Sequence, residues 1–243
     1  MKTIILLLVL TLISGCSKVQ KKPETSETKK DTTSQIQSST STVPQGANDN
    51  NEQTKPALIN VEYGISKLPT GLSGYEGKIM AMAKWEDKLG ANVVFITETS
   101  EKYSGDDNRH KELYGYHYIT SDDANKLLWK INDFIKDCPV DITIKYIDES
   151  LSITDLDNNG IGESSFLYRM SCKGDVSPDA MKLLMHEGET KYAIRGEMKL
   201  EVKGEGTYGG KMEIDPSFDK APGEFLEFAR SQWNKYKDEK VGY

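Results

Sequence analysis

Short segments with alternating apolar and polar residues dominate this chain after about residue 75. Residues 93–97 and 140–146 are rich in β-branched side chains, and in residues 112–120 Tyr114, Tyr116 and Tyr118 fall on one face of an extended chain. A side-chain period of two residues is typical of β-strands. Further strands are expected at 151–154, 165–170, 198–202 and 211–214, with a hairpin at 182–197 that turns at Gly188.

Two other segments have helical spacing instead. Leucine, isoleucine and phenylalanine recur every three or four residues in 122–136, and Pro139 follows them. Residues 222–237 begin with Pro222, which suits a first helical turn, and carry Phe225, Ala229 and Trp233. We therefore predict an α+β fold, a mostly antiparallel β-sheet with two helices at about 122–136 and 222–237.

The N-terminus has a different character. A basic start and an apolar run at 4–13, too short to span a bilayer, indicate a signal peptide at 1–15. The ending at 13–16 resembles the lipobox of bacterial lipoproteins, which implies that Cys16 is acylated and holds the protein on a membrane. Ser17 after it resembles the signal for the outer membrane and leaves the leaflet open. The alternative is an ordinary secreted protein with an unmodified cysteine.

Residues 16–56 are almost free of apolar side chains and show no periodicity. Such a segment buries too little surface to offset the entropy of ordering, so a disordered tether is expected. Residues 57–243 then form a single domain. The net charge of −7, with lysines dispersed among acids, indicates no nucleic-acid partner.

The chemically most informative stretch is 155–163. Asp155, Asp157 and Asn159 alternate before Gly160, and Glu163 follows, with a backbone carbonyl expected from Ile161. Oxygen ligands at this spacing suit Ca²⁺ in a structural role. The glutamate that an EF-hand needs three residues later is replaced by Phe166, and strands rather than helices are expected on both sides.

This strand–loop–strand arrangement resembles the calcium loops of bacterial VCBS and FG-GAP repeats, which implies Ca²⁺ held between strands. The alternative is an Asn-Gly hairpin turn with solvated acids. A second turn at 87–92 repeats the pattern weakly, without most of the acids, and is expected to be structural.

With Cys16 acylated, Cys138 and Cys172 remain, in an envelope compartment that permits disulfides. The compartment favours a bridge between them over two separate buried thiols. Three tyrosines, Tyr114, Tyr116 and Tyr118, offer a possible glycan-stacking stripe, although packing of one sheet face is the commoner use of such a pattern. No catalytic motif is present, and the isolated histidines lack zinc-site spacing.

Segments 112–118, 155–163, 171–178 and 185–196 together resemble a lipoprotein family of Bacteroidota labelled "surface polysaccharide biosynthesis protein". The resemblance spans most of 75–240 and implies a connection to lipopolysaccharide or capsule production. It implies no known reaction, so no catalytic residue is carried over.

The resulting prediction is a lipid-anchored, non-enzymatic envelope protein that binds or supports surface-polysaccharide machinery. The alternatives are a glycan-acting enzyme that uses carboxylates and a purely structural lipoprotein. An enzyme requires acids that converge in a concave cleft, and this requirement separates the classes.

Overall fold

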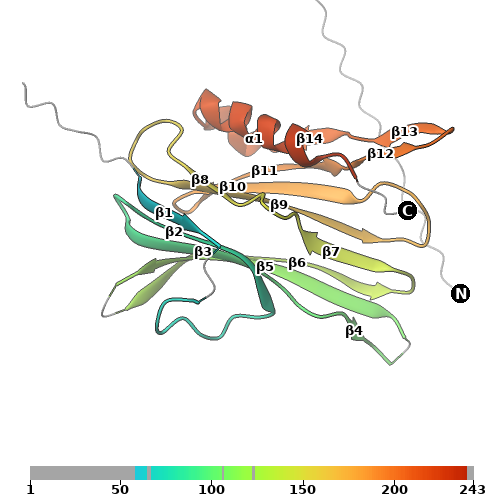
Figure 1. Cartoon of the computed structure of the whole chain (residues 1–243), viewed down its shortest axis with the longest axis horizontal. Coiled ribbons are helices and arrows are strands. Elements are labelled where there is room, and N and C mark those ends of the chain that lie inside the picture. Colours follow the sequence, from blue (N-terminus) through green and yellow to red (C-terminus); the bar gives the residue numbers. More distant parts are fainter. Residues whose placement is uncertain (1–57, 65–66, 106, 122–123, 240–243) are drawn as a thin grey trace, which may run out of the picture. The chain divides into compact units, whose positions relative to one another are not determined.

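The computed structural model describes residues 58–64, 67–105, 107–121 and 124–239. The expected signal peptide at 1–15, Cys16 and the expected tether at 16–56 lie outside these ranges. Two antiparallel sheets of six strands each stack into a β-sandwich (Figure 1). The first sheet contains β1 (Ile59–Tyr63), β2 (Lys78–Asp87), β3 (Gly90–Glu98), β4 (Lys102–Tyr103), β5 (Arg109–Thr120) and β6 (Asn125–Cys138).

The second sheet follows it in the sequence. It contains β7 (Ile142–Tyr146), β8 (Ser152–Thr154), β9 (Glu163–Cys172), β10 (Ala180–Glu187), β11 (Thr190–Glu197) and β14 (Met212–Ile214). Strands β7 and β8 both pair with β9, one after the other along its length. A small ribbon of β12 (Lys199–Val202) and β13 (Gly206–Gly209), a 3-10 turn η1 (Pro216–Lys220) and helix α1 (Gly223–Tyr236) complete the described chain.

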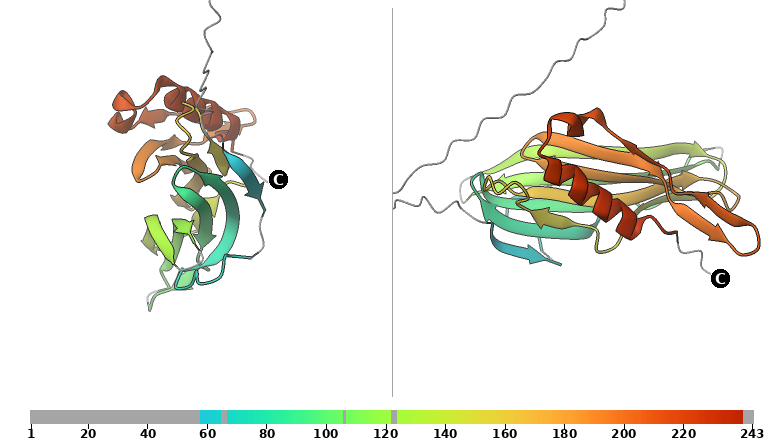
Figure 2. Two further views of the ribbon diagram at one scale, coloured as in Figure 1. Left: turned by 90° about the vertical axis from the view of Figure 1, so that its left-hand side faces the viewer. Right: turned by 90° about the horizontal axis from the view of Figure 1, so that it is seen from above.

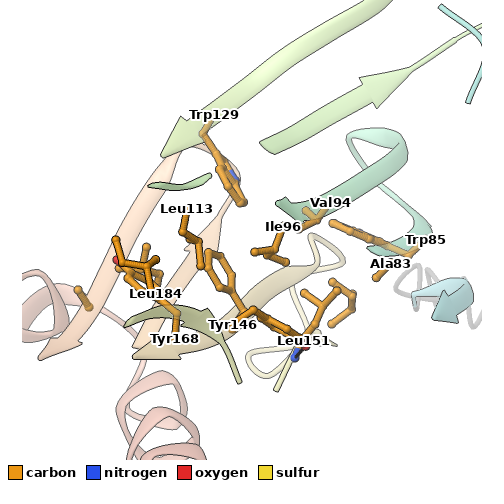
Figure 3. Packing of buried hydrophobic residues seen from close by; sticks show 14 residues of the cluster. Ala83, Trp85, Val94, Ile96, Leu113, Trp129, Tyr146, Leu151, Tyr168 and Leu184 are labelled. Atoms are coloured by element: carbon orange, nitrogen blue, oxygen red, sulfur yellow. Dashed lines mark hydrogen bonds between the residues drawn. The ribbon is translucent and has the colours of Figure 1, made fainter. Parts of the chain in front are cut away.

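The main core lies between the two sheets (Figure 3). Inward-facing residues alternate with outward-facing ones along most strands, as the period of two requires. Val94 and Ile96 of β3 face Phe166 of β9 and Ile144 of β7, and all four side chains are fully buried. The predicted mostly antiparallel β fold is therefore confirmed.

Helix α1 lies across the outer face of the second sheet (Figure 2). Its buried residues Phe225, Ala229 and Trp233 recur every four positions, so they form one stripe. That stripe packs on Met181, Leu183 and other odd-numbered residues of β9 and β10. The helix predicted at about 222–237 is thus observed, with Pro222 as its N-cap.

The outer face of the first sheet is also covered. Leu68, Leu72 and Tyr75, from the segment before β2, pack on a cluster that includes Tyr114 and Tyr116. These two rings are only 8% and 2% exposed, so their faces are not open to a sugar. Tyr114 and Tyr116 therefore pack one face of the sheet, which is the alternative to a glycan-stacking role. Tyr118 lies partly buried beside the same cluster.

The helix predicted at about 122–136 is wrong, because this segment is strand β6. From residue 129 onward, Trp129, Ile131 and Ile135 face inward, and the residues that alternate with them, Lys130, Asn132 and Phe134, are exposed. Two features hid this alternation. A register shift opposite His117 and Tyr118 adds one residue beside Leu127, and Asp133 occupies an inward position where an apolar residue is expected.

Asp133 is tolerated at an inward-facing position because its carboxylate forms hydrogen bonds with residues of the second sheet. It accepts hydrogen bonds from Tyr168 Oη at 2.9 Å and from Lys182 Nζ. Within the described ranges α1 is the only α-helix, so the fold contains one of the two expected.

The Cys138–Cys172 disulfide is confirmed, with sulfurs 2.08 Å apart and Cα atoms 5.8 Å apart. Because β6 is a strand, the bridge joins the last residue of β6 to the last residue of β9. It therefore ties one sheet to the other. The hairpin that turns at Gly188 is also confirmed, as β10 and β11.

Candidate metal centre

The loop between β8 and β9 has the strand–loop–strand setting that the sequence indicates (Figure 1). Its chain reverses through Asn158 and Gly160, whose φ angles are 54° and 80°. Asparagine and glycine tolerate this left-handed region better than other residues do. The sharp turn therefore follows from the local sequence.

Side chains within the loop bind its own backbone. The Asp155 carboxylate accepts the Gly160 N–H at 3.2 Å, and Asp157 Oδ1 accepts the Asn159 N–H at 3.0 Å. Asn159 Oδ1 accepts the Ile161 N–H at 2.7 Å. These turn-type bonds draw the acidic side chains towards the centre of the loop.

Three carboxylates converge as a result. Asp155, Asp157 and Glu163 each offer an oxygen atom, and these oxygens lie within 4.8 Å of one another. Asp155 and Asp157 are half-buried, and Glu163 is fully buried. Three negative charges this close repel one another unless a proton or a cation joins them.

The two oxygens of Glu163 have different surroundings. Oε2 accepts hydrogen bonds from Thr154 Oγ1 at 2.8 Å and from the Leu156 N–H at 3.0 Å. Oε1 is buried and has no hydrogen-bond partner among the described residues. Burial raises the pKa of Glu163 to about 7, with Asp157 and Glu187 adding to the effect.

Glu187 is a fourth acid that sequence reasoning missed. It ends β10 and lies directly opposite Glu163 in the β9–β10 ladder. The Asn159 amide bridges it to the cluster, because Nδ2 donates to Asp157 Oδ2 at 3.0 Å and also to Glu187 Oε1. Burial raises the pKa of Glu187, and the charges of Asp157 and Asp155 raise it further.

The turn between β2 and β3 holds the loop from the other sheet. Asp87 Oδ2 accepts the Gly162 N–H at 2.9 Å and Trp85 Nε1–H at 2.8 Å. Lys88 donates its N–H to Gly160 O at 3.0 Å and its Nζ to Asn159 O at 2.6 Å. The two turns that resemble each other in sequence are therefore in contact.

Gly162 makes this contact possible. A Cβ atom at that position would lie 2.5 Å from Trp85 Nε1, which is closer than real contacts allow. Only glycine lets the loop backbone approach the tryptophan this closely.

The structure thus brings together three of the five ligands expected from the sequence. Asn159 takes part through its side chain, whose Oδ1 accepts the Ile161 N–H and whose Nδ2 donates to Asp157 and Glu187. Glu187 could have been suspected from its place at the end of a predicted strand. Its position opposite Glu163 depends on the pairing of β9 with β10, which no local pattern reveals.

No protein-family model, curated protein or solved structure matches this chain. Within the described residues, no helix has both the length and the apolar character needed to cross a bilayer. The geometry of the loop is therefore the main basis for a functional proposal.

Proposed function

We propose that this protein is a lipid-anchored envelope lipoprotein whose β-sandwich domain binds calcium. Ca²⁺ binds Asp155, Asp157 and Glu163, and Glu187 is linked to this cluster through the Asn159 amide. The observation that carries the proposal is Glu163 Oε1, a buried oxygen that has no hydrogen-bond partner among the described residues and belongs to a cluster of three carboxylates. A buried oxygen of this kind is costly unless it binds a proton or a cation.

The donor set favours Ca²⁺ over other metals. All three clustered ligands are carboxylates, whereas zinc and copper sites are usually built from histidine and cysteine. Ca²⁺ accepts six to eight oxygens in flexible geometry, so the loop carbonyls and water complete the shell. Mg²⁺ demands near-ideal octahedral geometry and suits a loop of this kind less well.

A structural role for the ion agrees with the surroundings of the acids. Asp155 and Asp157 bind backbone N–H groups inside the loop, and neither of the two surface grooves described below is lined by the cluster. Acids held in this way are poorly placed to transfer protons to a substrate. This favours a non-enzymatic binding or accessory protein over a glycan-acting enzyme.

Lipid anchorage through Cys16 and a role in surface-polysaccharide production are part of the same proposal. They rest on the lipobox at 13–16 and on the family resemblance of the segments between 112 and 196. The sandwich adds a rigid scaffold, linked by a disulfide, of a kind suited to an oxidising envelope.

Thermal unfolding of the purified full-length protein in detergent tests the calcium site. Ca²⁺ at 100 times its Kd is expected to stabilise the wild type by about 2.7 kcal/mol relative to chelator. Glu163→Gln and Asp157→Asn should lose this response. Asp175→Asn, in the exposed turn between β9 and β10, is the matched control and should keep it. Identical wild-type melts with Ca²⁺ and with chelator would remove the proposal.

A surface-polysaccharide gel tests the biological role. Cells without the gene should show a lost or shortened ladder that the wild-type copy restores. An unchanged ladder would mean that the family label does not describe this protein.

A further inference from the structure

Two grooves meet at the turn between β7 and β8. The first, of about 430 Å³, is lined by Tyr63, Met80, Tyr146 and Leu151. The second, of about 540 Å³, is lined by residues that include Lys145, Lys235 and Tyr236. Tyr146, Asp148 and Glu149 line both, so the grooves are continuous around this turn. Each volume falls in the range of small-ligand sites.

Three tyrosines in these grooves are fixed in the same way. The Tyr63 hydroxyl accepts the Ile153 N–H at 2.8 Å, and the Tyr146 hydroxyl accepts the Leu151 N–H at 2.9 Å. Tyr236 donates its hydroxyl to Glu149 O at 2.6 Å. All three rings are thus anchored to the backbone of one short segment, so little freedom is lost when a ligand packs against them.

Tyr63 is the most accessible of the three. Its side chain remains 51% exposed although its hydroxyl is bound. Tyr146 is buried beside Leu151 (Figure 3), and both residues line the first groove. The result is a rigid, half-open aromatic surface rather than a closed apolar cavity.

The rim carries charges of both signs. Asp148 and Glu149 are exposed, and the charge of Glu149 interacts with that of Lys235 across the turn. Lys145 and Lys235 stand on the side of the second groove. Glu149 also has a φ of 62°, an unfavourable backbone conformation for a glutamate, at the point where the grooves join.

The mixed charges of the rim favour uncharged ligands over charged ones. A ligand with charge of one sign would be attracted by one part of the rim and repelled by another. Hydroxyl groups both donate hydrogen bonds to carboxylates and accept them from lysines, so an uncharged polyol finds hydrogen-bond partners along the whole rim. The apolar C–H faces of sugar rings also match exposed tyrosine faces.

We infer that the joined grooves around the β7–β8 turn bind a segment of a neutral glycan chain longer than one sugar ring. This inference rests on the proposed role in surface-polysaccharide production and gives that role a physical site. It also places glycan contact at Tyr63 and Tyr236, away from the buried Tyr114 and Tyr116.

A binding assay with defined probes tests the inference. Full-length protein in detergent is titrated with neutral hexasaccharides of glucose, mannose, galactose and N-acetylglucosamine, and with a neutral surface-polysaccharide fragment from the producing cells. Hexagalacturonate and hexalysine serve as the anionic and cationic probes. At least one neutral probe should bind, and the charged probes should bind at least tenfold more weakly.

Variants then locate the site. Tyr63→Ala should weaken binding of the neutral probe at least tenfold. Tyr63→Phe keeps the ring but removes the hydroxyl that anchors it, and should weaken binding about threefold. The double variant Asp148→Ala/Glu149→Ala should weaken it at least tenfold. Tyr208→Ala on β13, an equally exposed tyrosine outside the grooves, should bind as the wild type does. Melting curves should show that all variants are folded.

The outcomes separate the two proposals. If neutral probes bind and the groove variants have no effect, the site is wrong while glycan binding stands. If no neutral probe binds but the gel ladder is lost on deletion, the accessory role stands and the inference fails. Preferred binding of hexalysine or hexagalacturonate overturns the neutral-glycan assignment, and release of reducing sugar would overturn the non-enzymatic proposal.

Discussion

Strand β9 is fastened at both ends, and the two links differ in kind. Its last residue, Cys172, is bonded covalently to β6. Its first residue, Glu163, belongs to the carboxylate cluster of the β8–β9 loop. The strand separates these ends by roughly 30 Å, so each link acts independently of the other. The covalent link holds in any oxidising medium, whereas the carboxylates at the acidic end repel one another unless a proton or a cation joins them.

The largest expected effect is at the covalent end. The Cys138→Ser/Cys172→Ser double variant opens a loop with a sequence separation of 34 residues. In the chain-entropy description this lowers the free energy of unfolding by about 3.8 kcal/mol. Denaturant unfolding followed by tryptophan fluorescence measures the loss, which should be equal with Ca²⁺ and with chelator. A loss that depends on Ca²⁺ would show that the two ends are coupled.

At the acidic end the next largest effect depends on pH. The folded-state pKa of Glu163 is raised to about 7 by burial, above the usual value of 4.5. The folded state therefore retains this proton where the unfolded state has lost it. Without Ca²⁺, stability contributed by this group is present below pH 4.5 and is lost as the pH rises to about 7.

That loss corresponds to about 3 kcal/mol between pH 4.5 and pH 7.5. It should appear as the difference between the wild type and Glu163→Gln, both measured in chelator. Ca²⁺ should abolish it, because the ion replaces the proton. Parallel pH profiles for the two proteins in chelator would contradict this account.

A smaller effect is expected at the turns that flank the two ends. Asp87 accepts four hydrogen bonds, two of which hold Trp85 and Gly162. Asp87→Ala should cost about 2 kcal/mol, since buried donors lose their acceptor, and it should weaken Ca²⁺ binding. Asp175→Ala at the opposite end removes similar turn bonds from an exposed loop and should leave Ca²⁺ binding unchanged. Calorimetric titration with Ca²⁺ compares the two, and equal Ca²⁺ affinities would show that Asp87 does not position the loop.

The smallest effect concerns Lys88. Its ammonium group binds Asn159 O at the exposed edge of the loop and repels an approaching cation. Lys88→Gln should strengthen Ca²⁺ binding by about 0.5 kcal/mol, roughly twofold in Kd. The gain should disappear at high salt. A weaker site would mean that the hydrogen bond of Lys88 matters more than its charge.

Features encoded locally were predictable from the sequence, and features set by distant pairing were not. The 155–163 loop carries its turn residues and three of its acids within nine positions, and Phe225, Ala229 and Trp233 mark α1 by spacing alone. Strand β6 was mistaken for a helix because Asp133 and a register shift interrupt its alternation. Glu187 was missed because only the β9–β10 ladder brings it opposite Glu163.

The order of the strands has a consequence for how the chain folds. The first sheet uses only β1 to β6, and its hydrogen-bonded neighbours are close in sequence. The second sheet is likewise built from the strands that follow. Each sheet can therefore grow from successive hairpins with short loop closures, which favours rapid formation. Cys138 ends the first sheet, and Ile142 at the start of β7 pairs with Cys172 in the second. The native thiols are therefore expected to meet as soon as β7 pairs with β9, so their oxidation would tie the two sheets together early in maturation.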